Sequence, residues 1–199
     1  MRTAILTLAF LFGGALGAFA QESSVRLNPY AGWYHFDEVS FEEAFDTSET
    51  ESDPVYGLRL GIGGTDGWSL DLAYGRTTIG VEVPGLEGTT ISDDATIQLF
   101  YAALDWHLPT TGTMDLFLSG GAGGIDTAFD DGGSETDLLL NYGVGVAIPM
   151  GSLRLRADLK DQVDLCSKPE ELEADSFQAC FEDETLHNIE LTGGVEIPL

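Results

Sequence analysis

The sequence predicts an all-β fold, an eight-stranded antiparallel up-and-down β-barrel that spans a membrane. The first observation is a strict two-residue alternation in residues 153–160 and 189–199, which places apolar side chains on one face of each strand. The second is that the opposite faces carry charges of both signs, with Arg154 and Arg156 in one segment and Glu190 in the other. An apolar outer wall around a polar interior is typical of a transmembrane barrel.

Residues 1–20 have the features of a cleaved secretory signal. Arg2 gives the segment a positive start, and residues 5–12 form a short apolar stretch. Residues 18–20 (Ala-Phe-Ala) fit the small-x-small pattern of a signal-peptidase site, so we expect cleavage after Ala20. No apolar run approaches the ~20 residues that a membrane-spanning helix needs. We therefore expect one barrel domain over residues 21–199.

Eight segments have the pattern of barrel strands, and each is close to the ~9 to 11 residues that cross a bilayer at a tilt. They are residues 25–36, 54–63, 67–77, 95–107, 115–126, 137–148, 153–161 and 186–198. The connections alternate between short and long, which is the third observation. The long ones are residues 37–53, 78–94, 127–136 and 162–185. Short turns at one end and long loops at the other are typical of a transmembrane barrel, and an even strand number puts both termini at the turn end.

Glycine and aromatic residues fit the same fold. Glycines within the predicted strands relieve crowding where a small barrel curves or its lumen is narrow. Gly61 and Gly63 run from a strand into a turn and not into a helix, which excludes a dinucleotide-binding loop. Girdles at the two membrane interfaces, or ordinary core packing, would explain the large aromatic residues near strand ends. These are Trp33, Tyr56, Trp68, Tyr74, Trp106 and Tyr142.

The formal net charge is −26, with 34 acidic and 8 basic residues. This sign excludes a nucleic-acid partner. Most of the acidic residues fall in the long connections, so we expect four acidic outer loops. These loops are either simply solvated or are sites where divalent cations bridge the protein to anionic lipid and lipopolysaccharide. No spacing matches an EF-hand, and neither a cofactor motif nor a metal-ligand set is present in the sequence.

Four basic residues of the predicted strands, Arg59, Arg154, Arg156 and Lys160, fall on the inward-facing parity. We expect a lumen charge network that consists of Arg59, Asp71, Asp105, Arg154, Arg156, Asp158, Lys160, Glu190 and Glu196. A charge in a narrow lumen is costly unless it is paired, and eight strands leave an interior just wide enough for side chains. The network is therefore either a structural plug, which we favour, or a gate or narrow ion path.

Two cysteines, Cys166 and Cys180, lie in the last long connection. After export they meet an oxidising compartment, where a disulfide that closes this short loop is the expected state. Their spacing fits no zinc motif, since further Cys or His ligands are absent nearby.

Several fragments, in this order and spacing, resemble the OmpA-like family of outer-membrane β-barrels across nearly the whole chain after residue 20. They are residues 29–32 (Pro-Tyr-Ala-Gly), 56–61 (Tyr-Gly-Leu-Arg-Leu-Gly), 141–145 (Asn-Tyr-Gly-Val-Gly), 153–156 (Leu-Arg-Leu-Arg), 187–188 (His-Asn) and 193–195 (Gly-Gly-Val). The resemblance implies a monomeric barrel in the outer membrane of a Gram-negative bacterium, often with a structural or surface-interaction role. The peptidoglycan-binding domain of longer members is not expected, and Pro198-Leu199 replaces the aromatic residue with which the family usually ends.

Two other classes of function are weighed against this one. Some eight-stranded outer-membrane barrels modify lipid A, which requires a nucleophile, a base and an acid within hydrogen-bond reach. None of His35, His107 and His187 has a serine two residues later, and His187 is the best single candidate for a base. We therefore expect no enzyme and no catalytic residues.

A soluble, lipocalin-like ligand-binding barrel has the same alternation, because exchanging inside and outside leaves the sequence period unchanged. The ordered loop lengths and the lack of a helix before the last predicted strand favour the membrane barrel.

Overall fold

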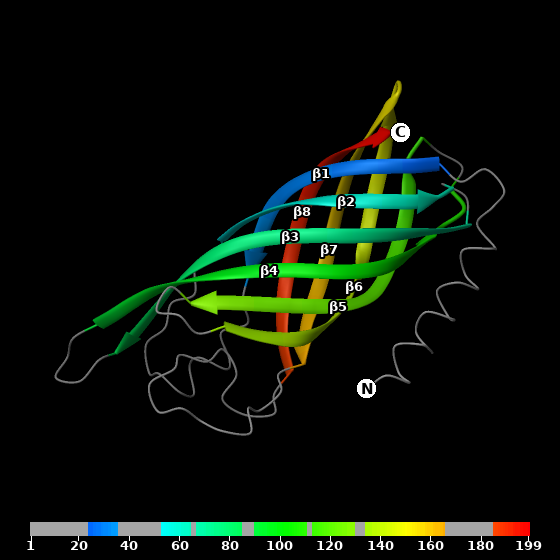
Figure 1. Cartoon of the computed structure of the whole chain (residues 1–199). Helices are drawn as coiled ribbons and strands as arrows, with labels where there is room; N and C mark the ends of the chain where they lie inside the picture. Colours follow the sequence, from blue (N-terminus) through cyan, green and yellow to red (C-terminus); the bar gives the residue numbers. More distant parts are fainter. Residues whose placement is uncertain are drawn as a thin grey trace.

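The computed structural model describes residues 24–35, 53–64, 67–84, 90–110, 113–129, 134–165 and 185–199. Its strands close into a barrel in chain order, and the first strand pairs with the last (Figure 1). The strands are β1 (Ser24–His35), β2 (Asp53–Gly63), β3 (Gly67–Pro84), β4 (Thr90–His107), β5 (Asp115–Phe129), β6 (Ser134–Met150), β7 (Leu153–Leu165) and β8 (Thr185–Pro198). Every pairing is antiparallel. The fold class predicted from the sequence is confirmed.

The two ends of the barrel differ in their connections. Residues 64–66, 108–114 and 151–152 link β2 to β3, β4 to β5 and β6 to β7 at one end, where β1 begins and β8 finishes. We call this the turn end and the opposite one the loop end. In a transmembrane barrel of this kind, short turns face the periplasm and longer connections face the cell exterior.

Two of the four long connections predicted from the sequence, residues 78–94 and 127–136, consist mostly of strand and not of loop. Strands β3 and β4 continue to Pro84 and from Thr90, so most of residues 78–94 is paired strand. Likewise β5 reaches Phe129 and β6 starts at Ser134. The polar and acidic residues there resemble loop sequence, yet antiparallel pairing satisfies their backbone groups beyond the membrane. Figure 1 shows the β3–β4 hairpin projecting past the rest of the barrel at the loop end.

The outer wall is apolar between two levels of aromatic rings. At the turn end Trp68 and Trp106 stack, with ring centroids 6.0 Å apart, and at the loop end Tyr74 and Phe100 lie 4.9 Å apart. Between these levels the exposed residues are aliphatic, as Leu72 and Leu104 illustrate. Of the residues described, none belongs to a helix long and apolar enough to cross a bilayer. The placement of these rings fits girdles at two interfaces.

The lumen has two layers with different chemistry. Its turn-end half is charged, whereas its loop-end half combines an apolar cluster, contributed mostly by β2 to β6, with buried polar residues of β7 and β8 such as Gln162 and Asn188. We call this apolar cluster the apolar layer, and its members are Tyr34, Val55, Ala73, Ile79, Ala95, Ile97, Leu99, Tyr101, Ala103, Ile125 and Leu139. The expectation of a polar interior therefore omitted an apolar cluster in the loop-end half.

The apolar layer has a physical cause that strand β4 makes visible. On its outer face the residues change from apolar at Phe100 to polar at Gln98, and on its inner face Leu99 and Ile97 are buried. Beyond the hydrocarbon the outer wall meets water, so the strands bury apolar residues inside, as a soluble barrel does. The reversal marks the loop-end boundary of the hydrocarbon between Phe100 and Gln98.

Glycines make room for aromatic rings inside the barrel. A Cβ added at Gly75 would lie 2.7 Å from the Tyr30 hydroxyl, and one added at Gly57 would lie 2.6 Å from it. A Cβ at Gly145 would collide with the ring of Phe117. These glycines let the two rings lie across neighbouring strands and contact arginines of the charged half.

Candidate functional site

Arg156 on β7 is the centre of the charged half of the lumen. Its guanidinium contacts Asp158 on its own strand, with Nη2 2.7 Å from Oδ1. It also reaches three other strands: Nη1 lies 2.7 Å from Asp71 Oδ2 on β3 and 3.3 Å from Glu196 Oε1 on β8, and Nη2 lies 2.9 Å from Asp105 Oδ2 on β4. The ring of Phe117 lies under it at 4.3 Å. One side chain therefore ties both sides of the barrel together.

Arg59 on β2 forms a second centre beside the first. Its Nη1 lies 2.9 Å from Asp158 Oδ2 and donates to Asn28 Oδ1 at 3.1 Å. Its Nε lies 4.0 Å from Asp71 Oδ2, and its guanidinium stacks on the Tyr30 ring at 4.5 Å. Because Asp158 and Asp71 each contact both arginines, the two centres form a single ionic layer. Almost no water reaches it, since Arg59 is 1% exposed and Asp71 is fully buried.

All nine residues expected in the lumen charge network lie on the inward face, but two of them stand apart. Lys160 donates to the hydroxyl of Tyr101 at 3.3 Å and lies over its ring, and no ion pair joins it to a carboxylate of the described residues. Glu190 accepts a hydrogen bond from Gln162 at 2.6 Å. Lys160 and Glu190 are register partners on β7 and β8, yet each turns to a different neighbour.

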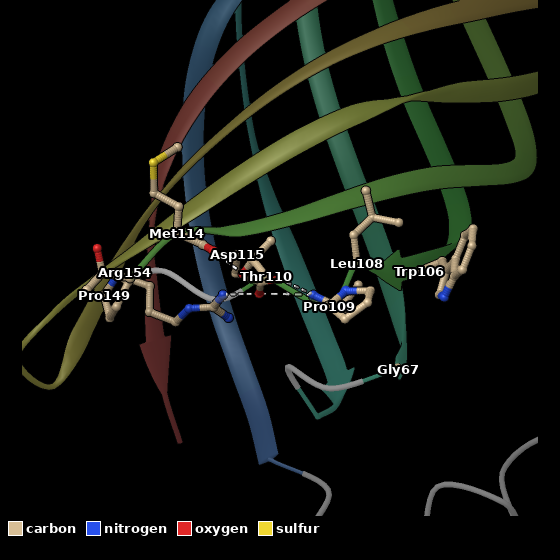
Figure 2. Close-up of a pocket in the computed structure, with 11 residues that line it drawn as sticks. Gly67, Trp106, Leu108, Pro109, Thr110, Met114, Asp115, Pro149 and Arg154 are labelled. Atoms are coloured by element: carbon tan, nitrogen blue, oxygen red, sulfur yellow. Dashed lines mark hydrogen bonds and ion pairs between the residues drawn. The ribbon is translucent and has the colours of Figure 1, made fainter.

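A chain of polar contacts continues from the ionic layer to the turn end. Arg154 Nη1 lies 2.9 Å from Glu196 Oε2, and Arg154 also pairs with Asp115 (Figure 2). Asp115 in turn contacts His107 Nδ1 at 3.0 Å, and His107 Nε2 lies 2.8 Å from Ser69 Oγ. Because a carboxylate only accepts, Nδ1 donates to Asp115, which leaves Nε2 of the neutral ring to accept from Ser69.

Ser69, His107 and Asp115 have the distances of a nucleophile, a base and an orienting acid. Sequence reasoning could not find this arrangement, because the three residues lie on β3, β4 and the start of β5. The Ser69 side chain is fully buried, however, so a substrate carbonyl cannot come within the ~3 Å that attack requires. The three residues therefore form a structural hydrogen-bonded cluster at the turn end, which we call the strut (Ser69, His107 and Asp115).

A pocket of about 820 Å³ opens at the turn end beside this strut. Figure 2 shows its apolar wall, to which Trp106, Leu108 and Met114 contribute, and its charged wall, which Asp115 and Arg154 form. Both charged groups already bind each other, so neither offers an unpaired charge to a ligand.

Several inward polar residues were not predicted from the sequence: Arg26, Asn28, Ser69, His107, Asp115 and Gln162. Strand parity was the available signal for Arg26 and Asn28, since both alternate with Val25 and Leu27. Arg26 donates to the carbonyl of Gly63 at 2.9 Å and lies 3.9 Å from Glu196. The same parity places His107 with Asp105 on the inner face of β4, but its contact with Asp115 depends on the turn between them.

Other predicted sites fall partly or wholly outside the described residues. Cys166 and Cys180 lie outside them, as do residues 1–20 with the expected cleavage after Ala20 and much of the acidic loop sequence. Within the described ranges, no group of three or more His, Cys, Asp or Glu residues is arranged to hold a metal ion. His187, the best single candidate for a base in the sequence, lies on the outer face, where its Nδ1 is 2.9 Å from Asp161 Oδ2.

Comparison with known proteins identifies the family. The structure resembles that of Neisserial surface protein A, with a TM-score of 0.58 and 12% identity over 89% of this chain and 97% of that one. It also resembles a major outer membrane protein from Thermus thermophilus, with a TM-score of 0.56 and 14% identity over 90% of this chain and 100% of that one. At these identities the likeness concerns the fold alone.

No curated protein sequence matches the chain significantly. The model of the outer membrane protein beta-barrel domain matches residues 6–181, which confirms the resemblance and indicates an outer-membrane location. The chain belongs to the family of outer membrane β-barrel proteins.

Proposed function

We propose that this protein is a monomeric integral outer-membrane barrel with a closed lumen and a structural or surface-interaction role, without catalytic chemistry. The observation that carries the proposal is the position of Arg156, which binds carboxylates on β3, β4, β7 and β8. Breaking such a buried ion pair is strongly unfavourable because the remaining partner stays buried and charged. The ionic layer therefore supports a permanent plug more than a gate that opens in normal use.

The apolar layer supports the same function. An ion that passed the lumen would meet the ionic layer and then a level that is narrowed by the buried aliphatic side chains of Ile97 and Leu99. A hydrophobic constriction opposes ion flow because it excludes water. Two unlike barriers in series favour a closed barrel.

Planar-bilayer recording tests the closed lumen. Purified protein is expected to give no steady conductance at moderate voltage, because both layers exclude hydrated ions. Steady open conductance of the wild-type protein would overturn the plug. The matched control is a known porin reconstituted from the same detergent, which establishes that insertion is being detected.

The filled lumen and the apolar outer wall of the barrel disfavour the lipocalin-like alternative. A lipocalin-type barrel holds its ligand in an interior cavity, whereas this lumen is filled by side chains and the aliphatic residues between the ring levels lie outside. Alkaline or urea washing of membranes distinguishes the two: the protein is expected to stay in the pellet, and its release would support a soluble barrel.

A lipid A-modifying enzyme is the second candidate, and one observation favours it, the contacts among Ser69, His107 and Asp115. Two features oppose it: the burial of Ser69 and the location of the three residues at the turn end, whereas lipid A of the outer leaflet borders the loop end. We therefore assign them a structural role. An unchanged lipid A mass spectrum on deletion or overexpression of the gene is the expected result.

Outer-membrane lipid and lipopolysaccharide are the partners that this function implies. Calcium bridging at the acidic loops remains part of the proposal, and calorimetric titration in the millimolar range tests it. The absence of any heat of binding there would remove calcium from the proposal while leaving the closed barrel intact.

A further inference from the structure

Arg76 on β3 differs from every other basic residue in the part of the chain that the structure describes. Arg26, Arg59, Arg154, Arg156 and Lys160 turn inward, whereas Arg76 is exposed on the outer wall. Within the described ranges Arg76 makes no hydrogen bond and no ion pair. An exposed guanidinium that none of the described residues pairs is available to bind an anionic group from its surroundings.

The level of Arg76 indicates what those surroundings are. On the outer face of β3 it lies two residues beyond Tyr74, or ~7 Å further toward the loop end. Its register partners are Tyr56 on β2 and Gln98 on β4. Tyr56 is 57% exposed, and Gln98 accepts a hydrogen bond from Tyr74 at 3.2 Å. Arg76 therefore lies just past the hydrocarbon boundary, at the level of lipid headgroups in the outer leaflet.

An apolar groove of about 370 Å³ lies on the outer wall next to this position. Residues of β2, β3 and β4 line it: Leu58, Leu60, Leu72, Ala73, Tyr74, Phe100 and Tyr101. Tyr74 and Phe100 belong both to the groove and to the loop-end aromatic level beneath Arg76. A cation at headgroup level beside an apolar groove matches an amphiphile with an anionic head and an acyl chain.

We propose that Arg76 and this groove bind lipid A of the outer leaflet, with a phosphate on the guanidinium and an acyl chain along the groove. Arginine suits this partner because its planar guanidinium donates two parallel hydrogen bonds to phosphate oxygens. The inference rests on the proposed function, since only an integral barrel presents this wall to lipid. It goes further by assigning the contact to one sector, β2 to β4.

Native mass spectrometry of the full-length protein in detergent tests the proposal. The probes are lipid A, dephosphorylated lipid A and phosphatidylglycerol, each titrated separately. Arg76→Gln is expected to weaken lipid A binding about tenfold, the loss of one charge-assisted contact, and Arg76→Lys to retain most of it. Leu60→Trp, which fills the groove, is expected to weaken the binding of both lipid A and dephosphorylated lipid A.

Asp161→Asn is the matched control. Asp161 lies on β7, four strands away on the opposite side of the ring, and contacts Tyr142 and His187 there. If net charge alone governed binding, this change would strengthen it as much as Arg76→Gln weakens it, and that result would overturn the proposal.

Two further outcomes would also overturn it: equal binding of lipid A to the wild-type and Arg76→Gln proteins, and equal binding of phosphatidylglycerol and lipid A. Failure of the parent function is distinguishable, because it would appear as release of the protein by alkaline washing whatever residue stands at position 76.

Discussion

Arg156 and Asp158 lie two residues apart on the inner face of β7, and both carboxylate oxygens of Asp158 accept hydrogen bonds from the Arg156 guanidinium at 2.7 to 3.1 Å. The same carboxylate binds Arg59 from β2 at 2.9 Å. Alternation along a single strand thus produces a pair to which other strands attach. The contribution of the ionic layer to the free energy of unfolding therefore depends on the contacts between Arg156 and Asp158.

Arg156→Met tests that dependence. Removal of the guanidinium leaves Asp71, Asp105, Asp158 and Glu196 facing one another in a buried space, and loss of one partner of a buried ion pair costs about 3–5 kcal/mol. We expect a fall of this size in the free energy of unfolding, measured by urea titration of the barrel in lipid vesicles with tryptophan fluorescence. Arg76→Lys, on the outer wall, is the control. A change below about 1 kcal/mol would contradict a structural ionic layer.

The two-layer lumen predicts a specific pattern of conductance. Arg156→Ala alone is expected to leave the barrel closed, since the apolar layer still excludes water. Ile97→Ser with Leu99→Ser is expected to leave it closed too, because the ionic layer remains. Only the triple variant should conduct steadily in planar bilayers. Open channels from Arg156→Ala alone would indicate that the ionic layer is the sole barrier.

Gly145→Leu is expected to destabilise the barrel by about 1–3 kcal/mol, the usual cost of overpacking. Phe117 would have to leave the space above residue 145, and with it the stacking position under Arg156. The measurement is the midpoint of heat-modifiability on a gel. Gly120→Ala is the control, because its added Cβ would meet nothing closer than 4.0 Å. Equal midpoints for both variants would argue against the contact.

The hydrocarbon boundary predicts that the cost of a charge depends on its level. Leu104→Arg, between the two aromatic levels, is expected to cost about 2–4 kcal/mol, and Thr78→Arg, beyond Arg76, about 0–1 kcal/mol. Urea unfolding in vesicles measures both. Comparable costs at the two positions would mean that the boundary lies elsewhere along β3 and β4.

The strut at the turn end predicts that Ser69 is unreactive. A fluorophosphonate probe is expected to leave it unlabelled in the folded protein, because its side chain is fully buried. Intact-mass analysis checks this, with Ser69→Ala as the control for labelling elsewhere. An adduct that is lost in Ser69→Ala would revive the hydrolase alternative.

Much of the fold could be predicted because period and parity are local properties. Arg154, Arg156 and Asp158 alternate with leucines and alanine on β7, which was enough to assign the faces of that strand. The apolar layer could not be predicted, since Ile97 and Leu99 alternate with Gln98 at the same period but in the opposite phase. A period of two does not say which face is inside.

The partners within the site were less predictable than its members. Lys160 and Glu190 were expected to form ion pairs, yet Lys160 donates to Tyr101 and Glu190 accepts from Gln162. Which groups meet across a lumen depends on the stagger between strands and on side-chain length, and neither is contained in a single strand. His107 and Asp115 were missed for the same reason.

The pairing of β1 with β8 has a consequence for biogenesis. The ring cannot close until β8 meets β1, and β8 carries Glu196, the carboxylate that joins Arg154 to Arg156. In an open sheet without that pairing, the arginines and aspartates would be accessible to water. Closure thus removes most of the charged groups from water in one late step, so insertion and neutralisation of the interior are coupled.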